Sequence, residues 1–113
     1  MDTANLSLKL LDIPAEKRDH WYRTLRDPVF IPVYNYANMT DARHHTMAKV
    51  RKVFSERLVS VKEFNTNPHN VFSSHEFVGL IDPAQAIKHT VQMNLFGGTC
   101  LALHNGQHDY LFD

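Results

Sequence analysis

Histidine is the residue type in this sequence with the most chemical potential. Eight histidines occur among 113 residues, and imidazole serves both as a metal ligand and as a general base near neutral pH. His104 and His108 are four residues apart, a spacing that can hold zinc on one helix face. Asn105-Gly106 lies between them and is expected to break the helix, and no third ligand is evident. The pair therefore does not predict a metal centre.

The other histidines suggest structural roles. His44 and His45 are adjacent and would point in different directions on a helix, so both are expected at the surface. His75 stands next to Glu76, but neighbouring side chains on a helix do not face each other, which argues against an acid–base pair. We expect His75 in the core, with one hydrogen bond satisfied.

Neither the single cysteine nor the glycine pair completes a reactive set. Cys100 lies in an apolar run without a basic neighbour, and is expected to be buried and inert. One cysteine excludes a disulfide within the chain and favours a reducing compartment. Gly97-Gly98 is not part of a phosphate-binding loop, and no G-x-S-x-G elbow occurs. The sequence thus offers no catalytic, cofactor-binding or metal-ligating residue.

Composition predicts a folded, intracellular chain of one domain spanning residues 1–113. Hydrophobic residues make up 43% and charged residues 21%, as in globular proteins. Twelve basic residues balance twelve acidic ones, so the basic excess typical of nucleic-acid binders is absent. The first residues do not form a signal peptide, and no run approaches the roughly 20 apolar residues of a membrane span.

The elements that must position these residues are all predicted to be helices. Pro14 predicts a helix start, with Asp12 near that end as a cap, and Pro28 ends the helix at Asp27. An irregular connector follows to Asn38, pinned by its aromatic side chains. A second helix is expected from Thr40-Asp41, with a solvated basic face that includes Lys49. Its apolar stripe has helical spacing over Met47, Val50, Phe54, Leu58 and Val61.

Two further helices begin with an Asx-Pro signal. Asn67-Pro68 opens one whose shared face is expected to contain Phe72, His75, Glu76 and Gly79. Asp82-Pro83 opens the other, which is apolar around most of its girth to Leu103 and is expected to be buried on several sides. Gly97-Gly98 within it predicts a close approach of another backbone. The segment 107–113 reads as the start of another helix cut short at Asp113.

The run from Val91 to Thr99, VQMNLFGGT, resembles a V-Q-x-N-L-F-G-G-T run in acyl-CoA oxidases, late in their N-terminal helical domain. The segment Arg26–Phe30 is similar to the family's early D-P-x-F element. A later family segment, G-T-x-x-H-x-x-x-[YF], is matched at His108 and Phe112, whereas His104-Asn105 replaces the Gly-Thr pair. The resemblance extends over about residues 12–113 and is specific only in the Val91–Thr99 run.

This resemblance implies an all-α, antiparallel helical bundle like the N-terminal domain of acyl-CoA dehydrogenases and oxidases, truncated before the flavin-binding β-domain. The whole enzyme would use FAD to oxidise acyl-CoA to trans-2-enoyl-CoA in peroxisomal fatty acid β-oxidation, and oxygen would yield hydrogen peroxide. The catalytic glutamate and the flavin contacts would lie beyond Asp113, so this part is expected to be inactive and not to bind FAD alone. A homodimer would form through the missing domains.

One substrate-binding role transfers with the resemblance. The corresponding helix in the superfamily walls the acyl-chain pocket, and Ile87, Val91 and Leu95 recur every four residues on one face here. Plain core packing is the competing interpretation of this stripe. For the chain as a whole, a non-catalytic helical interaction module is the alternative function, and a histidine-rich metal binder is a weaker third.

Overall fold

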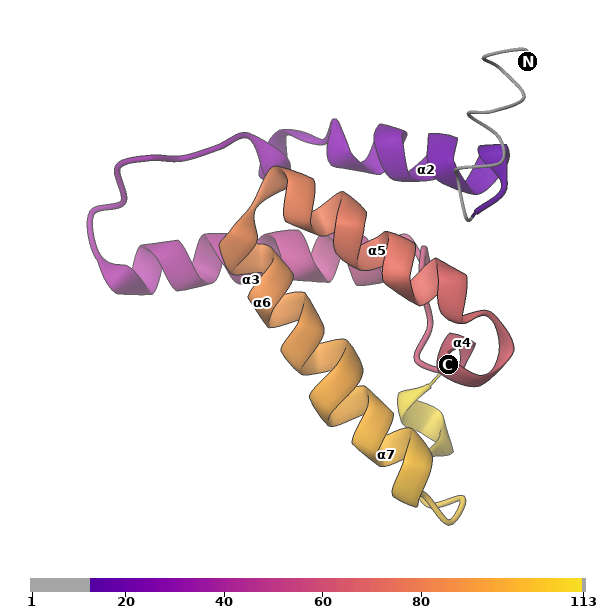
Figure 1. The fold of residues 1–113 in the computed structure, drawn as a ribbon. Coiled ribbons are helices and arrows are strands. Elements are labelled where there is room, and N and C mark those ends of the chain that lie inside the picture. The colour runs from indigo at the N-terminus through magenta and orange to yellow at the C-terminus, as the bar shows by residue number, and fades with distance from the viewer. Residues whose placement is uncertain (1–12, 113) are drawn as a thin grey trace, which may run out of the picture.

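The computed structural model describes residues 13–112, and this part of the chain contains helices and turns but no β-strand. The predicted all-helical class is therefore confirmed for the described residues (Figure 1). Asp12, the expected first cap, lies outside them. In chain order the elements are α2 (Ala15–Leu25), the 3₁₀ turn η1 (Pro28–Phe30), α3 (Met39–Ser55), α4 (Glu63–Thr66), α5 (Pro68–Ile81), α6 (Pro83–Thr90), the π-helical η2 (Val91–Gly97), α7 (Gly98–Leu103) and the 3₁₀ turn η3 (Asp109–Leu111).

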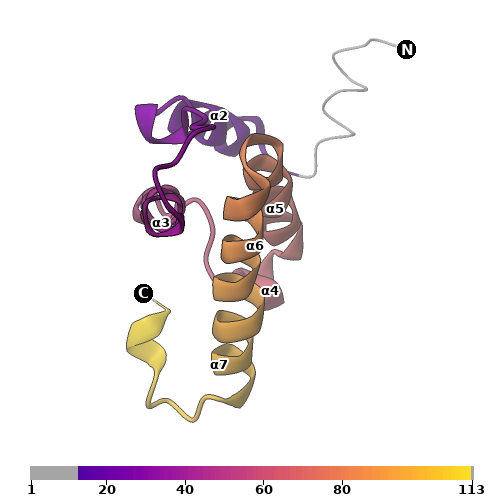
Figure 2. The ribbon, with the colours of Figure 1, turned by 90° about the vertical axis from the view of Figure 1, so that its left-hand side faces the viewer.

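The last three helical elements before η3 form one continuous rod. Figure 1 shows α6, η2 and α7 running end to end, and we refer to residues 83–103 as the rod. Its α6 portion contacts both α5 and α3. Figure 2 shows α6 and α5 side by side below α2, while α7 extends away from α2 and the chain then turns back. The rod is thus anchored mainly by its first half.

Aromatic packing joins α2 to α5. Trp21 is fully buried, and its ring stacks on Phe77 with centroids 5.3 Å apart, while Tyr22 meets the same phenylalanine edge-on. Stacked and edge-to-face ring pairs add roughly 0.5–1.5 kcal/mol beyond the area they bury. The apolar core around them comprises Ile13, Phe30, Val53, Leu58, Val59, Val71, Val78 and Met93.

Helix α3 starts earlier and ends earlier than its sequence pattern predicts. Asn38 caps it by accepting a hydrogen bond from the backbone N–H of Asp41 at 2.9 Å. The helix ends at Ser55 because Arg57 adopts a left-handed conformation, with φ of 51°. Leu58 and Val61 therefore do not continue the helical stripe, although Leu58 is still buried in the core.

The rod buries one side instead of most of its girth, so the prediction of burial on several sides is wrong for the described structure. Its start is as predicted, since the Asp82 carboxylate accepts hydrogen bonds from the backbone N–H groups of Ala84 and Gln85. Cys100 is half-buried rather than buried. The residues with the least exposure recur every four positions: Gln85, His89, Met93 and Gly97.

Two basic side chains are placed differently from expectation. Lys49 is only 2% exposed, because it turns inward to a carboxylate instead of joining a solvated face. His45 is half-buried, and its ring nitrogens lie 2.6 Å from the Tyr36 hydroxyl and 3.0 Å from the Val29 carbonyl oxygen. Tyr36 thus attaches the connector 28–38 to α3 as predicted, whereas the side chain of Tyr34 is 87% exposed and does not contribute to this attachment.

The predicted shared face of α5 is also rearranged. Phe72 is 66% exposed and Gly79 is exposed, so that side of the helix does not face the core. Asn67 precedes Pro68 as expected, but its side chain makes no capping hydrogen bond. The buried positions of α5 are Asn70, Val71, Ser73, Ser74, Phe77 and Val78.

Candidate functional site

An exposed apolar face runs along the rod on the side away from the core. Ile87, Val91 and Leu95 are 68%, 41% and 63% exposed, and each stands two residues from a buried position. Two residues correspond to about 200° around an α-helix, which places the two stripes on opposite sides. A shallow hollow of about 340 Å³ lies along this face, lined by Ala84, Ile87, Lys88, Val91 and Gln92. The residues predicted to wall an acyl pocket are therefore together and accessible.

The same stretch departs from α-helical geometry. Residues Val91–Gly97 form a π-helix, and the backbone N–H of Gly98 reaches back five residues to the Met93 carbonyl oxygen. π-Helical segments are rare and occur frequently at functional sites. The described backbone therefore singles out most of the run from Val91 to Thr99.

Gly97 lets the rod approach the loop before α4. A β-carbon at this position would lie 2.6 Å from Val61 Cγ2 and 3.1 Å from the Gln92 carbonyl oxygen. The predicted close approach is thus present at Gly97, but its partner is the Val61 side chain rather than a neighbouring backbone. Gly98 has no comparable neighbour, since its nearest atom would be the Met93 carbonyl oxygen at 3.7 Å.

A buried ion pair fixes the start of the rod. The Lys49 Nζ atom of α3 lies 2.6 Å from Asp82 Oδ2, while Asp82 Oδ1 caps α6. Burial alone would raise the pKa of Asp82, but hydrogen bonds from Lys49 and from the α6 backbone outweigh it and lower that pKa below 3.8. The Asp82 carboxylate therefore both caps the start of α6 and links that start to α3.

A polar cluster lies farther along the buried side of the rod. His89 is fully buried, with Nε2 3.1 Å from the Ser74 hydroxyl of α5. Its ring stacks on Phe54 of α3 at 5.5 Å and meets His75 edge-on at 5.0 Å. His75 is half-buried rather than in the core as predicted, although it has the expected hydrogen bond, with Nδ1 2.8 Å from the Val71 carbonyl oxygen.

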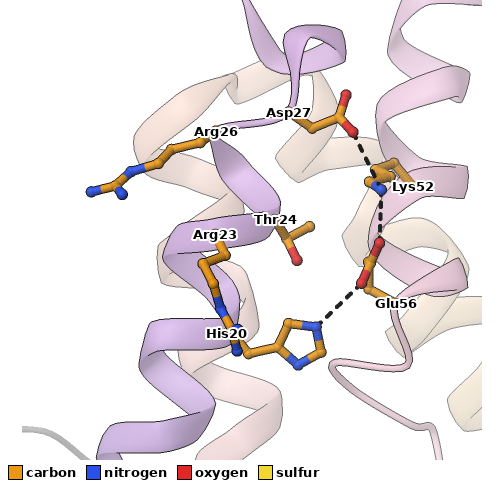
Figure 3. Close-up of a pocket in the computed structure, with 7 residues that line it drawn as sticks. All are labelled: His20, Arg23, Thr24, Arg26, Asp27, Lys52 and Glu56. Carbon is orange, nitrogen blue, oxygen red and sulfur yellow. Dashed lines mark hydrogen bonds and ion pairs between the residues drawn. The ribbon is translucent and has the colours of Figure 1, made fainter.

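A separate hollow between α2 and α3 is lined by charges. Figure 3 shows Lys52 between Asp27 and Glu56, at 3.3 Å and 2.7 Å, with His20 joined to Glu56 at 3.2 Å. The hydrogen bond from Lys52 is the main cause that lowers the pKa of Glu56. The hollow measures about 400 Å³ and is open to solvent, so these groups act as a surface network that ties α2 to α3.

His104 and His108, whose spacing in sequence could hold zinc on a helix face, are not part of one helix. The rod ends at Leu103, so His104 and His108 do not share a helix face, and His104 lies 3.2 Å from Asp109 instead. Among residues 13–112, no group of three or more histidine, cysteine, aspartate or glutamate side chains could hold a metal ion. The same residues contain no helix long and apolar enough to cross a membrane.

Three polar residues are buried without having been predicted to be so: His89, Gln85 and Lys49. A signal was present in the four-residue spacing of Gln85, His89, Met93 and Gly97. That spacing was obscured because the opposite stripe is more apolar. The rod differs from the usual amphipathic helix, whose polar side faces water, because polar residues lie on its buried side.

Comparison with known proteins yields no relative. No family model matches the chain, and neither the curated proteins nor the solved structures contain a significant match to it. A functional assignment therefore rests on the residues and geometry of the chain itself.

Proposed function

We propose that this chain is the N-terminal helical portion of an FAD-dependent acyl-CoA oxidase, which converts acyl-CoA to trans-2-enoyl-CoA and reduces oxygen to hydrogen peroxide. The observation that carries the proposal is the accessible apolar face of Ile87, Val91 and Leu95, on the segment whose sequence resembles that family. On the basis of this resemblance we also propose a peroxisomal location and a role in fatty acid β-oxidation.

The proposed role of the rod is to provide one wall of the acyl-chain pocket. The three side chains are aliphatic and aligned, as suits contact with a hydrocarbon chain. Burying an aliphatic side chain gains about 1.5–3 kcal/mol, so an exposed row of three favours coverage by substrate or by another part of the enzyme. The buried side of the rod would hold this wall in place through Asp82, His89 and Gly97.

The described residues do not by themselves fit a flavin. The sequence has no glycine-rich phosphate loop, and the hollow beside Val91 is lined by one helix only. We therefore assign neither flavin contacts nor a catalytic residue within residues 13–112. Those parts belong, in the proposal, to segments that follow this one.

Oxidase activity of the complete gene product tests the proposal. The product should carry bound flavin and should form one hydrogen peroxide for each enoyl-CoA when supplied with acyl-CoA and oxygen. Palmitoyl-CoA and butyryl-CoA would serve as long and short substrates, and free coenzyme A as the blank. A complete gene product that binds no flavin and leaves both acyl-CoA substrates unchanged would overturn the proposal.

The same exposed face favours a second candidate function, a non-catalytic helical interaction module. In that case the three aliphatic side chains would contact a partner helix rather than a hydrocarbon chain. The two candidates differ in what binds to this face and in whether peroxide is formed. A module would bind a protein partner through this face and would show no acyl-CoA-dependent peroxide formation.

A further inference from the structure

His89 is held at the meeting point of three helices. It projects from α6 of the rod, contacts Ser74 and His75 of α5, and stacks on Phe54 of α3. The Ser74 and His89 side chains are both fully buried. A change in the charge of this imidazole therefore affects both the contact of the rod with α5 and its contact with α3.

The hydrogen-bond pattern favours a neutral His89. The Ser74 hydroxyl donates to the Val71 carbonyl oxygen at 2.7 Å, so its oxygen accepts from His89 Nε2–H at 3.1 Å. His89 Nδ1 is then a buried acceptor without a partner. Protonation would place a second N–H at Nδ1, where no acceptor is available among the described residues.

The surroundings of His89 also lack a compensating negative charge. From α5, the titratable group that faces it is His75, whose Nδ1–H donates to the Val71 carbonyl and whose Nε2 is buried without a partner. From α3, its ring contact is Phe54, and the buried charged residue of that helix, Lys49, is already paired with Asp82 at the rod start. On the rod itself Lys88 is adjacent in sequence and half-buried. Burial, and then the neighbouring His75, lower the pKa of His89 from 6.5 to about 4.

We propose that neutral His89 locks the rod onto α5 and α3, and that protonation of His89 in mildly acidic solution releases the rod. The proposal is independent of the oxidase function, because it concerns only the packing of residues 83–103. The folded-state pKa lies below the unfolded value of 6.5, so the unfolded side chain binds protons more readily. The lock is therefore complete above about pH 6.5 and weakens as the pH falls towards 4.

Hydrogen exchange of the backbone amides in the full chain tests this lock. Between about pH 7.5 and about pH 5.5, after correction for intrinsic exchange, protection of the rod should fall roughly ten-fold, and fall more than that of α2. In the His89→Gln variant, which keeps a hydrogen-bonding amide but does not titrate, rod protection should change less than two-fold. His44→Gln, at an exposed position, should behave like the unmodified chain.

Three results would overturn the proposal: rod protection that is constant over this pH range, an equal loss in His89→Gln, or a loss that is no greater in the rod than in α2. If His89→Gln does not fold, NMR titration of the His89 ring in the unmodified chain decides. A midpoint clearly below 6.5 supports the lock, and a midpoint at or above 6.5 in the folded chain overturns it.

Discussion

The Lys49 ammonium group lies 2.6 Å from Asp82 Oδ2, and the side chains are only 3% and 18% exposed. The pair joins the middle of α3 to the N-cap residue of the rod, 33 residues later in the chain. Removal of one partner from a buried pair leaves a charge without compensation, which costs more than the pair itself contributes. Because Lys49 is more deeply buried than Asp82, substitution of one partner should change the free energy of unfolding by a different amount from substitution of the other.

Asp82→Asn should destabilise the chain by about 3 kcal/mol, because asparagine can still cap α6 but leaves the Lys49 charge buried and unpaired. Lys49→Met should cost only about 1 kcal/mol, since the more exposed Asp82 keeps its backbone donors. Urea unfolding followed by Trp21 fluorescence measures both. The double variant should be no less stable than Asp82→Asn, and additive losses would contradict the buried-pair account.

Protonation of Asp82 should weaken the contact between α3 and the start of the rod, at a lower pH than the protonation of His89. The pKa of Asp82 is below 3.8 in the folded chain, so this carboxylate binds protons less readily than in the unfolded chain. Its contribution is present above about pH 4 and is lost as the pH falls through the folded pKa. Stability curves should show this loss in the unmodified chain and lack it in Asp82→Asn. A pH dependence unchanged by that substitution would assign it to other groups, among them Glu63, whose pKa is also lowered.

The two adjacent glycines of the rod should respond in opposite ways to alanine. Gly97→Ala should destabilise by about 1–3 kcal/mol, because the new methyl group would meet Val61 Cγ2 at 2.6 Å. Gly98→Ala meets only ordinary contacts and should be neutral or stabilising by up to about 1 kcal/mol through helix propensity. Thermal unfolding compares the two. Val61→Ala should offset only part of the Gly97→Ala loss, since the Gln92 carbonyl oxygen remains 3.1 Å away.

The turn after α3 offers a stabilising substitution. Arg57 has a φ of 51° and follows Glu56, the C-cap of α3, so it occupies the left-handed position where glycine is commonly found. Arg57→Gly should raise the free energy of unfolding by about 0.5–1 kcal/mol, because glycine adopts this conformation without strain. Arg57→Ala is the control that removes the side chain but retains the strain, and it should give no gain. Equal effects of the two would mean that the side chain, not the backbone, matters.

The start of the rod was predictable because its signal is local. Asp82-Pro83 places a capping carboxylate and a preorganised first turn side by side in sequence. The orientation of the rod was not predictable from apolar content. Met93 and Val91 are both apolar, yet Met93 is buried and Val91 is exposed, because contacts with residues distant in sequence determine which side of the rod faces the core. Ser74 provides a hydrogen-bond partner that draws His89 inward, against the rule that polar faces meet water.

For the candidate site, the sequence located the stripe but not its environment. The spacing of Ile87, Val91 and Leu95 placed them on one face, and the structure shows that face exposed. The sequence did not indicate the π-helical backbone of Val91–Gly97, since five-residue hydrogen bonding leaves no clear periodic pattern over seven residues. The end of α3 was missed because an arginine, rather than glycine, occupies the left-handed position.

Chain-length preference of the complete enzyme with Val91→Trp tests the central claim most directly, because it requires both oxidase activity and a pocket wall at this position. The added indole should lower kcat/KM for palmitoyl-CoA at least ten-fold and change that for butyryl-CoA less than two-fold. Thr99→Ser, at an exposed position of α7, is the matched control and should leave both values unchanged. Palmitoyl-CoA and butyryl-CoA oxidised by Val91→Trp at the same ratio as by the unmodified enzyme would contradict the proposed wall, and oxidation of neither by the unmodified enzyme would contradict the proposed function.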